Sequence, residues 1–169
     1  MNKGEKDNME EKTNVMRILD QKKLPYQAHF YEAEKAVSGT EVAKILGEDP
    51  AQVFKTLVTM GKTGQHYVFV IPVEKELDLK KAAKAVGEKS IVMIKSKELL
   101  PLTGYIHGGC SPIGMKKFFR TTIDQTVSGW DRFLFSAGKI GAQIEMSPED
   151  LQKVIVYQTA DLTVSGNSL

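Results

Sequence analysis

The chain has 169 residues, of which 41% are hydrophobic and 26% are charged, and its formal net charge at pH 7 is +2. This length suits one domain with a core of its own, and the nearly neutral charge says little about partners. The single cysteine excludes an internal disulfide, and no apolar run is long enough to span a bilayer. Because the N-terminus also lacks the pattern of a signal peptide, we expect a soluble cytoplasmic protein without a membrane partner.

The two ends of the chain differ in composition from the segment between them. Residues 1–12 are polar and charged without an apolar period, so we expect a disordered lead-in. Residues 161–169 have the composition of a polar tail. Between them we find no internal repeat and no linker that would divide the chain. The sequence therefore predicts a single domain over residues 13–160.

Helices are predicted where apolar residues recur every three or four positions behind a residue that can cap the helix. Thr13, Ser38 and Asp78 are such caps, and each precedes an apolar stripe. Gly47 and Gly87 end the second and the third of these helices. The three segments are therefore expected to be amphipathic helices that cover a sheet.

Two further helical segments and seven strands are expected in the chain. A helix starts behind the cap Ser147, and a helical turn that opens at Ser96 is expected to stop at Pro101. Strands are predicted by alternation or by clusters of β-branched and aromatic residues. They cover residues 26–32, 53–60, 66–72, 90–94, 118–124, 130–136 and 140–146. The second and third strands read as a hairpin, and 90–94 reads as a short buried strand.

The order of these elements predicts the fold class. Strands do not alternate strictly with helices, so a doubly wound parallel sheet is not favoured. The pattern favours an α+β fold with a curled, mixed or mainly antiparallel β-sheet that is flanked by helices.

The segment 104–119, GYIHGGCSPIGMKKFF, has four glycines, which suit a backbone that takes positive φ or that a ligand approaches closely. Gly109 and Gly114 have the spacing of a phosphate-binding loop, but Met115 occupies the position of its lysine. A nucleophile elbow also fails, because its last glycine is displaced by one residue. Neither motif is therefore present.

The same loop contains the only cysteine of the chain. Cys110 would need a base to act as a nucleophile, and His107 is three residues away. Packing in a crowded turn is the better interpretation of this thiol. No metal site is expected, because the three histidines are scattered and no Cys or His pair has ligand spacing. We also expect no cofactor.

A set of residues without an obvious nucleophile remains, and it suggests a site that works by binding and polarisation. Lys55 lies on the apolar side of a predicted strand, where a charge must be buried or point into a cleft. The N–H groups of Gly108 and Gly109 could form an oxyanion hole. Tyr31 and Ser136 complete this set.

Four segments carry a resemblance to a known family. They are VFKTL (53–57), LDLKKAAKAVG (77–87), GYIHGGCSPIGMKK (104–117) and SAGKIGAQIEMSPEDL (136–151). These segments resemble the YbaK-type Cys-tRNA(Pro) deacylases, within the superfamily of editing domains that act on misacylated tRNA(Pro). The resemblance extends over most of residues 14–160, and it implies a compact α+β fold with a strongly curved, barrel-like and mainly antiparallel sheet.

The resemblance also implies a reaction, which is the removal of cysteine from mischarged Cys-tRNA(Pro) and conceivably from Cys-tRNA(Cys). In the mechanism favoured for the family, the thiol of the substrate attacks its own ester carbonyl and leaves as a thiolactone. No enzyme nucleophile is then required. The implied partner is the acceptor end of the aminoacyl-tRNA, and prolyl-tRNA synthetase is a candidate second partner.

The resemblance assigns roles to individual residues of this chain. Lys55 would bind the terminal nucleotide and its charge, and the amides of Gly108 and Gly109 would stabilise the oxyanion. The substrate-binding set is Tyr31, His29, Ser136, Gln143 and Ser111. Gln143 stands where some members carry an acid, and it can form hydrogen bonds but brings no charge. Amino-acid selectivity is therefore left open.

Two other functions remain open at this point. A sister deacylase for Ala-tRNA(Pro) would share the fold, although GGCSPIGMKK is closer to the cysteine-specific type. A binding protein of the same fold could regulate another process with weak or no turnover. If water attacked in place of the substrate thiol, the base would have to be sought among His29, His107 and Glu145.

Overall fold

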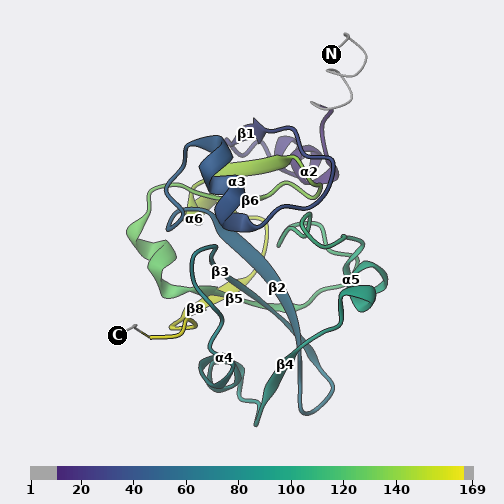
Figure 1. Ribbon diagram of the computed structural model, residues 1–169, viewed down its shortest axis with the longest axis vertical. Helices are drawn as coiled ribbons and strands as arrows, with labels where there is room; N and C mark the ends of the chain where they lie inside the picture. The colour runs from purple at the N-terminus through teal and green to yellow at the C-terminus, as the bar shows by residue number, and fades with distance from the viewer. Residues whose placement is uncertain (1–10, 166–169) are drawn as a thin grey trace.

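The computed structural model describes residues 11–165, so most of the expected lead-in and the last four residues of the tail lie outside it (Figure 1). The helices are α2 (Asn14–Gln21), α3 (Gly39–Leu46), α4 (Leu79–Val86), α5 (Ser96–Thr103), α6 (Pro148–Leu151) and the 3-10 helix η1 (Gln125–Gly129). The strands are β1 (Gln27–Phe30), β2 (Phe54–Gly61), β3 (His66–Pro72), β4 (Ile91–Met93), β5 (Arg120–Asp124), β6 (Phe133–Ser136), β7 (Ala142–Met146) and β8 (Tyr157–Ala160).

The strands form two sheets, with the orders β1-β7-β6 and β4-β2-β3-β5-β8. The pairings of β3 with β5 and of β5 with β8 are parallel, and the other pairings are antiparallel. An isolated parallel bridge between Val53 and Leu134 connects the two sheets. The predicted α+β fold with a mainly antiparallel mixed sheet is confirmed, although the two sheets do not close into a barrel.

The predicted caps begin the predicted helices. The Thr13 hydroxyl accepts the N–H of Met16, and the Ser38 hydroxyl accepts the N–H of Glu41. The Asp78 carboxylate accepts two N–H groups at the start of α4. These side chains satisfy backbone donors that have no partner inside the helix, which is why the helices start where the sequence predicts.

Pro101 does not stop α5, contrary to the sequence prediction. A proline inside a helix removes one backbone hydrogen bond, but α5 continues to Thr103. The hydroxyl of Thr103 donates to the carbonyl of Leu99 at 2.8 Å, and the N–H of Gly104 donates to the carbonyl of Leu100 at 2.9 Å. These two bonds close the last turn and offset the bond that the proline lacks.

The edge strands of the larger sheet also differ from the prediction. β4 is only partly buried: Ile91 lies in the core, but Val92 and Met93 are 51% and 46% exposed because β4 is an edge strand. β8 on the opposite edge was not predicted, since its sequence YQTA lacks a clear apolar alternation. Edge strands face neighbours on one side only, so their sequences carry a weaker signal.

The packed domain continues past the predicted boundary at residue 160. The side chain of Leu162 is fully buried, and its N–H donates to the carboxylate of Asp124 at 3.0 Å. Thr163 forms an isolated bridge with Leu77. The start of the expected polar tail is thus part of the fold, and it covers the end of β5.

The main core lies on one face of the β1-β7-β6 sheet and is shared with α2 and β2. It includes Val15 and Leu19 of α2, and the ring of Phe54 meets that of Phe133 edge-on at 5.2 Å. The opposite face of this sheet is covered by α3, where Ala43 packs in a cluster with Leu134 (Figure 1). The functional candidates lie on this second face.

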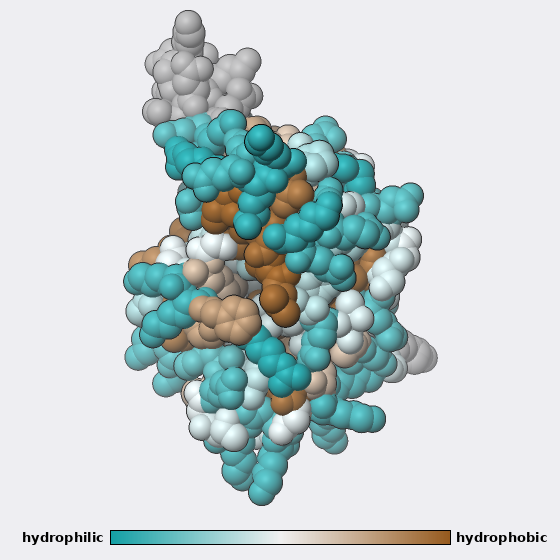
Figure 2. All heavy atoms as spheres, turned by 180° about the vertical axis from the view of Figure 1, so that it is seen from behind, coloured by the Kyte–Doolittle hydropathy of each residue, from teal (hydrophilic) through white to brown (hydrophobic). Residues whose placement is uncertain are grey.

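The back of the molecule carries an apolar area that hydrophilic side chains surround (Figure 2). Among the exposed large apolar side chains are Phe118 and Val156, which line one groove together with Met115, Phe119 and Ile155. None of these residues lines the pocket described below. No helix within residues 11–165 has both the length and the apolar character needed to cross a membrane.

Candidate functional site

A cavity of about 370 Å³ lies between β2, the start of α3, the glycine-rich loop and the β6–β7 pair. Four of the predicted site residues line it: Lys55, Gly108, Ser136 and Gln143. The structure therefore brings together side chains that the sequence places far apart.

The strand register explains why three of these side chains meet. The parallel bridge joins Val53 to Leu134. Lys55 and Ser136 each lie two residues further along their strands, so their side chains project to the same faces as those of Val53 and Leu134 and lie near each other. Ser136 is also the antiparallel partner of Gln143. Because directly opposed residues of a sheet project to one side, Ser136 and Gln143 both point towards the cavity.

Lys55 is a half-buried cation without a carboxylate partner in the described part of the chain. Its Nζ donates to the carbonyl of Val73 at 3.4 Å, a long hydrogen bond. Burial lowers the pKa of the Lys55 ammonium, and the more distant charge of Glu76 opposes this effect. An ammonium in such a cavity can bind an anionic group of a ligand more strongly than a solvated one.

Gly108 is required at its position for two reasons. Its φ of +87° lies in the left-handed region, and a Cβ there would come within 2.5 Å of the Cβ of Ala36. No acceptor within residues 11–165 takes its N–H. The Gly108 N–H is therefore an unpaired backbone donor beside the cavity.

Gly109 does not offer a second donor, although the sequence suggests one. Its N–H already donates to the carbonyl of Ile106 at 3.0 Å within the loop. A Cβ at Gly109 would lie 3.1 Å from the backbone of Lys139, so this glycine allows two loops to pack closely. The structure gives Gly109 a role in loop packing and leaves the Gly108 amide for a ligand.

Two buried polar atoms in the cavity wall lack a hydrogen-bond partner in the described residues. They are Oε1 of Gln143, whose side chain belongs to a residue only 6% exposed, and Oγ1 of Thr56. Such groups are rare in folded proteins because an unpaired buried acceptor is unfavourable. Thr56 was missed by the sequence analysis, and its place next to Lys55 in VFKTL is the signal that could have identified it.

Ser136 has a structural contact as well as a place in the cavity wall. Its Oγ accepts the N–H of Gly138 at 3.1 Å and so shapes the turn between β6 and β7. The residue is nearly buried. Its hydroxyl hydrogen can still be donated to a ligand, because the Gly138 contact uses only a lone pair.

Cys110 lines the cavity but is not an activated thiol. It belongs to the main core cluster, and burial raises its pKa to about 12, against the effect of a hydrogen bond with Thr103. A thiol with this pKa stays protonated near neutral pH and is a weak nucleophile. This agrees with the interpretation of Cys110 as a packing residue.

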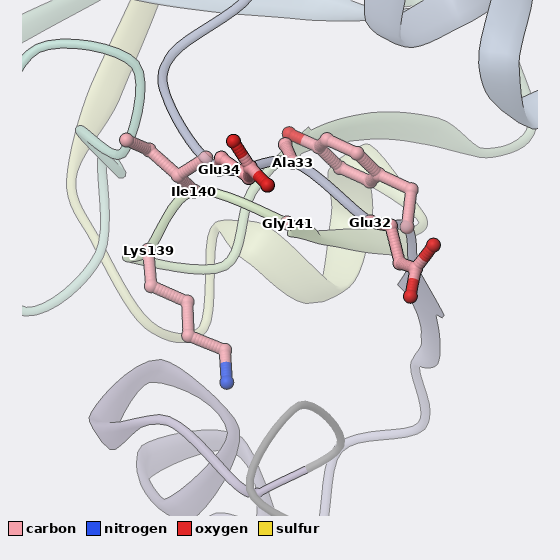
Figure 3. A pocket seen from close by; sticks show the side chains of 7 residues that line it. Glu32, Ala33, Glu34, Lys139, Ile140 and Gly141 are labelled. Carbon is pink, nitrogen blue, oxygen red and sulfur yellow. The ribbon is translucent and has the colours of Figure 1, made fainter. Parts of the chain in front are cut away.

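Besides Gly109, three predicted site residues do not line the cavity. Tyr31 lines a separate groove together with Glu32, Glu34 and Lys139, and Figure 3 shows the last three of these residues. Its own N–H donates to the carbonyl of Gly141 at 2.9 Å. Two glutamates and one lysine line this groove, so it differs in charge from the Lys55 cavity.

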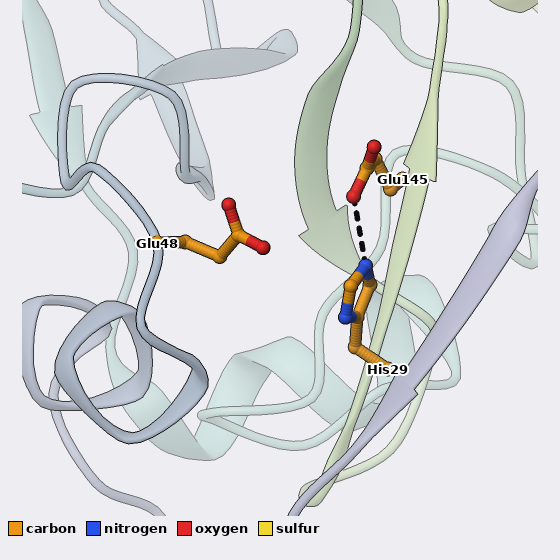
Figure 4. A group of neighbouring side chains, drawn as sticks. All are labelled: His29, Glu48 and Glu145. Atoms are coloured by element: carbon orange, nitrogen blue, oxygen red, sulfur yellow. Dashed lines mark hydrogen bonds and ion pairs between the residues drawn. The ribbon is translucent and has the colours of Figure 1, made fainter.

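His29 and Ser111 are also held by other parts of the protein. The Nε2 atom of His29 lies 2.8 Å from Oε1 of Glu145 (Figure 4). Ser111 is fully buried, and its Oγ accepts the N–H of Ile113 at 3.3 Å. Both residues therefore support the frame around the cavity.

Comparison with known proteins identifies the family. Residues 33–154 match the family described as "Aminoacyl-tRNA editing domain". A protein of Enterococcus faecalis named "Putative Cys-tRNA(Pro)/Cys-tRNA(Cys) deacylase EbsC" is 45% identical over 159 residues, which are 94% of this chain and 97% of that protein.

Solved structures agree with this match. The structure of "a putative trans-editing enzyme for prolyl tRNA synthetase" has a TM-score of 0.77 at 25% identity, over 90% of this chain and 99% of that one. The structure of "hypothetical protein APE2540" has a TM-score of 0.80 at 23% identity, over 90% and 100% of the two chains, and shows the shared fold. The chain belongs to the family of aminoacyl-tRNA editing domains.

Proposed function

We propose that this protein removes cysteine from mischarged Cys-tRNA(Pro) and that the thiol of the substrate is the attacking group. The similarity to a relative whose name gives this activity supports the choice of substrate. One observation carries the choice of mechanism: the cavity offers unpaired binding groups, while its one thiol has a pKa of about 12.

The reaction needs no group of the enzyme to form a covalent bond. The sulfur of the cysteinyl group attacks its own carbonyl carbon, and the carbonyl oxygen becomes an oxyanion. The bond to the ribose oxygen then breaks, and this oxygen takes up the proton that the thiol has released. The products are uncharged tRNA and a cysteine thiolactone, which water can open to cysteine.

Positioning is the main contribution that the protein has to make. A thiol held close to its own ester reacts without the entropy loss of a bimolecular encounter, an effect of up to about 7–11 kcal/mol in the best-oriented systems. A cavity of about 370 Å³ is large enough to enclose a cysteinyl group with part of the terminal nucleoside.

Each unpaired group of the cavity has a place in this scheme. The Lys55 ammonium binds the negative charge of the terminal nucleotide, and the Gly108 N–H donates to the developing oxyanion. Oε1 of Gln143 accepts a hydrogen bond from the α-ammonium of the cysteinyl group. The Thr56 hydroxyl forms a hydrogen bond with the sulfur or the carbonyl oxygen of the same group. In this arrangement each buried polar atom that lacks a partner in the protein gains one from the substrate.

The competing reactions differ in what the substrate must carry. Hydrolysis by water would need a general base, for which His29, His107 and Glu145 are the candidates. Only His107 lines the cavity, and His29 and Glu145 contact each other outside it. A deacylase for Ala-tRNA(Pro) would also have to use water, because alanine has no thiol. We further propose that prolyl-tRNA synthetase can supply selectivity for the tRNA.

A side-by-side deacylation assay tests the proposal. Cys-tRNA(Pro), Ser-tRNA(Pro), Ala-tRNA(Pro) and Cys-tRNA(Cys) are incubated with the protein, with and without prolyl-tRNA synthetase. We expect rapid loss of cysteine, slow loss of serine and alanine, and a preference for tRNA(Pro) only when the synthetase is present. Equal rates for the cysteinyl and seryl forms would show that water is the attacking species.

A further inference from the structure

We propose that His29, Glu48 and Glu145 form a binding site for a divalent transition-metal ion of the Zn²⁺ type. One ligand atom of each residue lies within 4.8 Å of the other two, and the three side chains are half-buried (Figure 4). The site lies beside the Lys55 cavity and shares no residue with it.

Backbone contacts hold all three residues in place. His29 lies on β1 and Glu145 on β7, which are paired strands. Glu48 follows the left-handed Gly47 at the end of α3, and its N–H donates to the carbonyl of Ala43 at 2.9 Å. The three donors therefore come from fixed positions in separate segments, and for this reason no ligand spacing was visible in the sequence.

Arg132 orients one of the carboxylates. Its Nε donates to Oε2 of Glu145 at 3.0 Å, and its Nη2 donates to the carbonyl of the same residue at 2.9 Å. The other oxygen, Oε1, is left to face Nε2 of His29 at 2.8 Å. A hydrogen bond to the second oxygen of a ligating carboxylate is a usual feature of metal sites, because it fixes the direction of the first.

The charge of the cluster favours a cation. Two carboxylates and one imidazole face one another, and Arg132 pairs with Glu145 only. Glu48 has no ion-pair partner in the described part of the chain. Figure 4 shows its carboxylate pointing towards the His29–Glu145 pair. A divalent ion would neutralise the charge that remains.

The donor set decides between metals. One imidazole nitrogen and two carboxylate oxygens suit Zn²⁺ and related transition ions, whereas Mg²⁺ and Ca²⁺ prefer oxygen alone. Bonds of about 2.0–2.2 Å to Zn²⁺ need donors somewhat closer together than 4.8 Å. Rotation of the Glu48 side chain can provide this approach, and water can take the fourth position. The imidazole binds through Nε2, and its proton moves to Nδ1.

A metal at this place would connect α3, on one side of the cavity, to β7, the strand that carries Gln143 on another side. Glu48 directly follows α3, and Val42 of that helix lines the cavity. His29 is the strand partner of Gln143, which lines the cavity from the opposite side. The ion would therefore fix α3 against the sheet that carries Gln143, acting as a clamp and not as a reactant.

Calorimetric titration of the metal-free full-length protein with Zn²⁺ tests the proposal without using deacylation. We expect one saturable site in each chain and an increase in the melting temperature when Zn²⁺ is present. Glu48→Gln, which preserves the size of the side chain, should weaken binding by about tenfold or more. His29→Ala should abolish it, and Glu74→Gln, a change at an exposed acid elsewhere, should bind like the wild type.

Co²⁺ in place of Zn²⁺ shows which atoms bind. The absorption spectrum should have the d–d bands of nitrogen and oxygen ligands without a thiolate charge-transfer band, because Cys110 takes no part. The proposal fails if the wild type shows no saturable site, or if Glu48→Gln binds Zn²⁺ as tightly as the wild type. The cluster would then be an ion-pair network only.

Discussion

Two polar regions of this protein use their side chains in opposite ways. Around Glu88, the carboxylate accepts hydrogen bonds from the Tyr67 hydroxyl at 2.6 Å and from the hydroxyl and N–H of Thr63. In the cavity, Lys55 has one long bond to a carbonyl, and Gln143 Oε1 lacks any partner in the described residues. The polar groups of the first region are paired within the fold, whereas the second region leaves groups that the proposed substrate would bind. Changes in the first should thus affect stability, and changes in the second should affect activity.

The largest expected effect is that of Lys55→Ala on activity. Loss of a charge that stabilises the transition state should lower the deacylation of Cys-tRNA(Pro) by about a hundredfold or more. The melting temperature should stay within a few degrees of the wild type, because the ammonium is partly desolvated and forms no ion pair with residues 11–165. Deacylation kinetics and thermal unfolding of the same preparation measure both.

Two further variants sharpen this test of Lys55. Lys55→Arg should recover little activity, since a planar guanidinium does not replace a compact ammonium. Lys62→Ala removes an exposed cation just after the same strand and should change neither quantity. A large drop in the melting temperature of Lys55→Ala would mean that this lysine belongs with the structural residues.

Gly108→Ala should lower activity by about tenfold or more, because the backbone must shift to relieve contact with Ala36. Gly64→Ala is the matched control. Gly64 has nearly the same φ, +90° against +87°, but open space around it. Both variants should lose stability from backbone strain, and only Gly108→Ala should lose activity. Equal activity in the two variants would remove the Gly108 amide from the proposed site.

Tyr67→Phe should lose stability and keep its activity, which is the reverse of what we expect for the cavity variant Lys55→Ala. It removes the hydroxyl that donates to Glu88 and should lower the melting temperature by a few degrees. Deacylation below the melting temperature should be unchanged, since Tyr67 packs with the α4 cluster and not in the cavity. A loss of activity in the folded variant would contradict the separation of the two regions.

The Glu88 region should also give a pH dependence. Hydrogen bonds from Thr63 and Tyr67 lower the pKa of the Glu88 carboxyl from its ordinary value of 4.5. A lowered pKa in the folded state adds stability above the unfolded value, and this stability is lost as pH falls through the folded value. The difference in melting temperature between the wild type and Glu88→Gln should thus shrink when the pH falls from 7 to below about 4. A difference that stays constant would contradict this origin.

The smallest expected effect on activity is that of Cys110→Ala. In the proposed mechanism the attacking sulfur belongs to the substrate, so deacylation should stay within a few-fold of the wild type. Loss of a buried sulfur should slightly lower the melting temperature. A fall in the deacylation rate of about a hundredfold, the scale of a lost catalytic group, would overturn the proposed mechanism.

The helices were predictable from sequence because their signals are local. A cap such as Ser38 and a terminator such as Gly47 lie directly next to the helix that they define. The exposure of β4 and the existence of β8 were not predictable, because both depend on which strands become edges of the sheet. The parallel pairing of β5 with β8 likewise joins segments that no local pattern connects.

The cavity was predictable in part. Lys55 was found because a lysine on the apolar side of a strand is unusual, and Gly108 because its loop is rich in glycine. Thr56 was missed, since a threonine in a strand is ordinary, and its place next to Lys55 gains weight only when the structure shows that its hydroxyl lacks a partner in the described residues. The bond from Gly109 to Ile106 could not be foreseen, because it depends on the conformation of the loop.

The pairing of β1 with β7 has a consequence for how this protein comes into being. Gln27 lies opposite Glu145, so β1 can pair only after the distant strand β7 has been made. Contacts between such distant segments form slowly, because a long loop must close first. During synthesis, the cavity cannot form until β7, which carries Gln143, has left the ribosome. A chain that is still being synthesised would therefore lack the complete editing cavity until Met146 has been added.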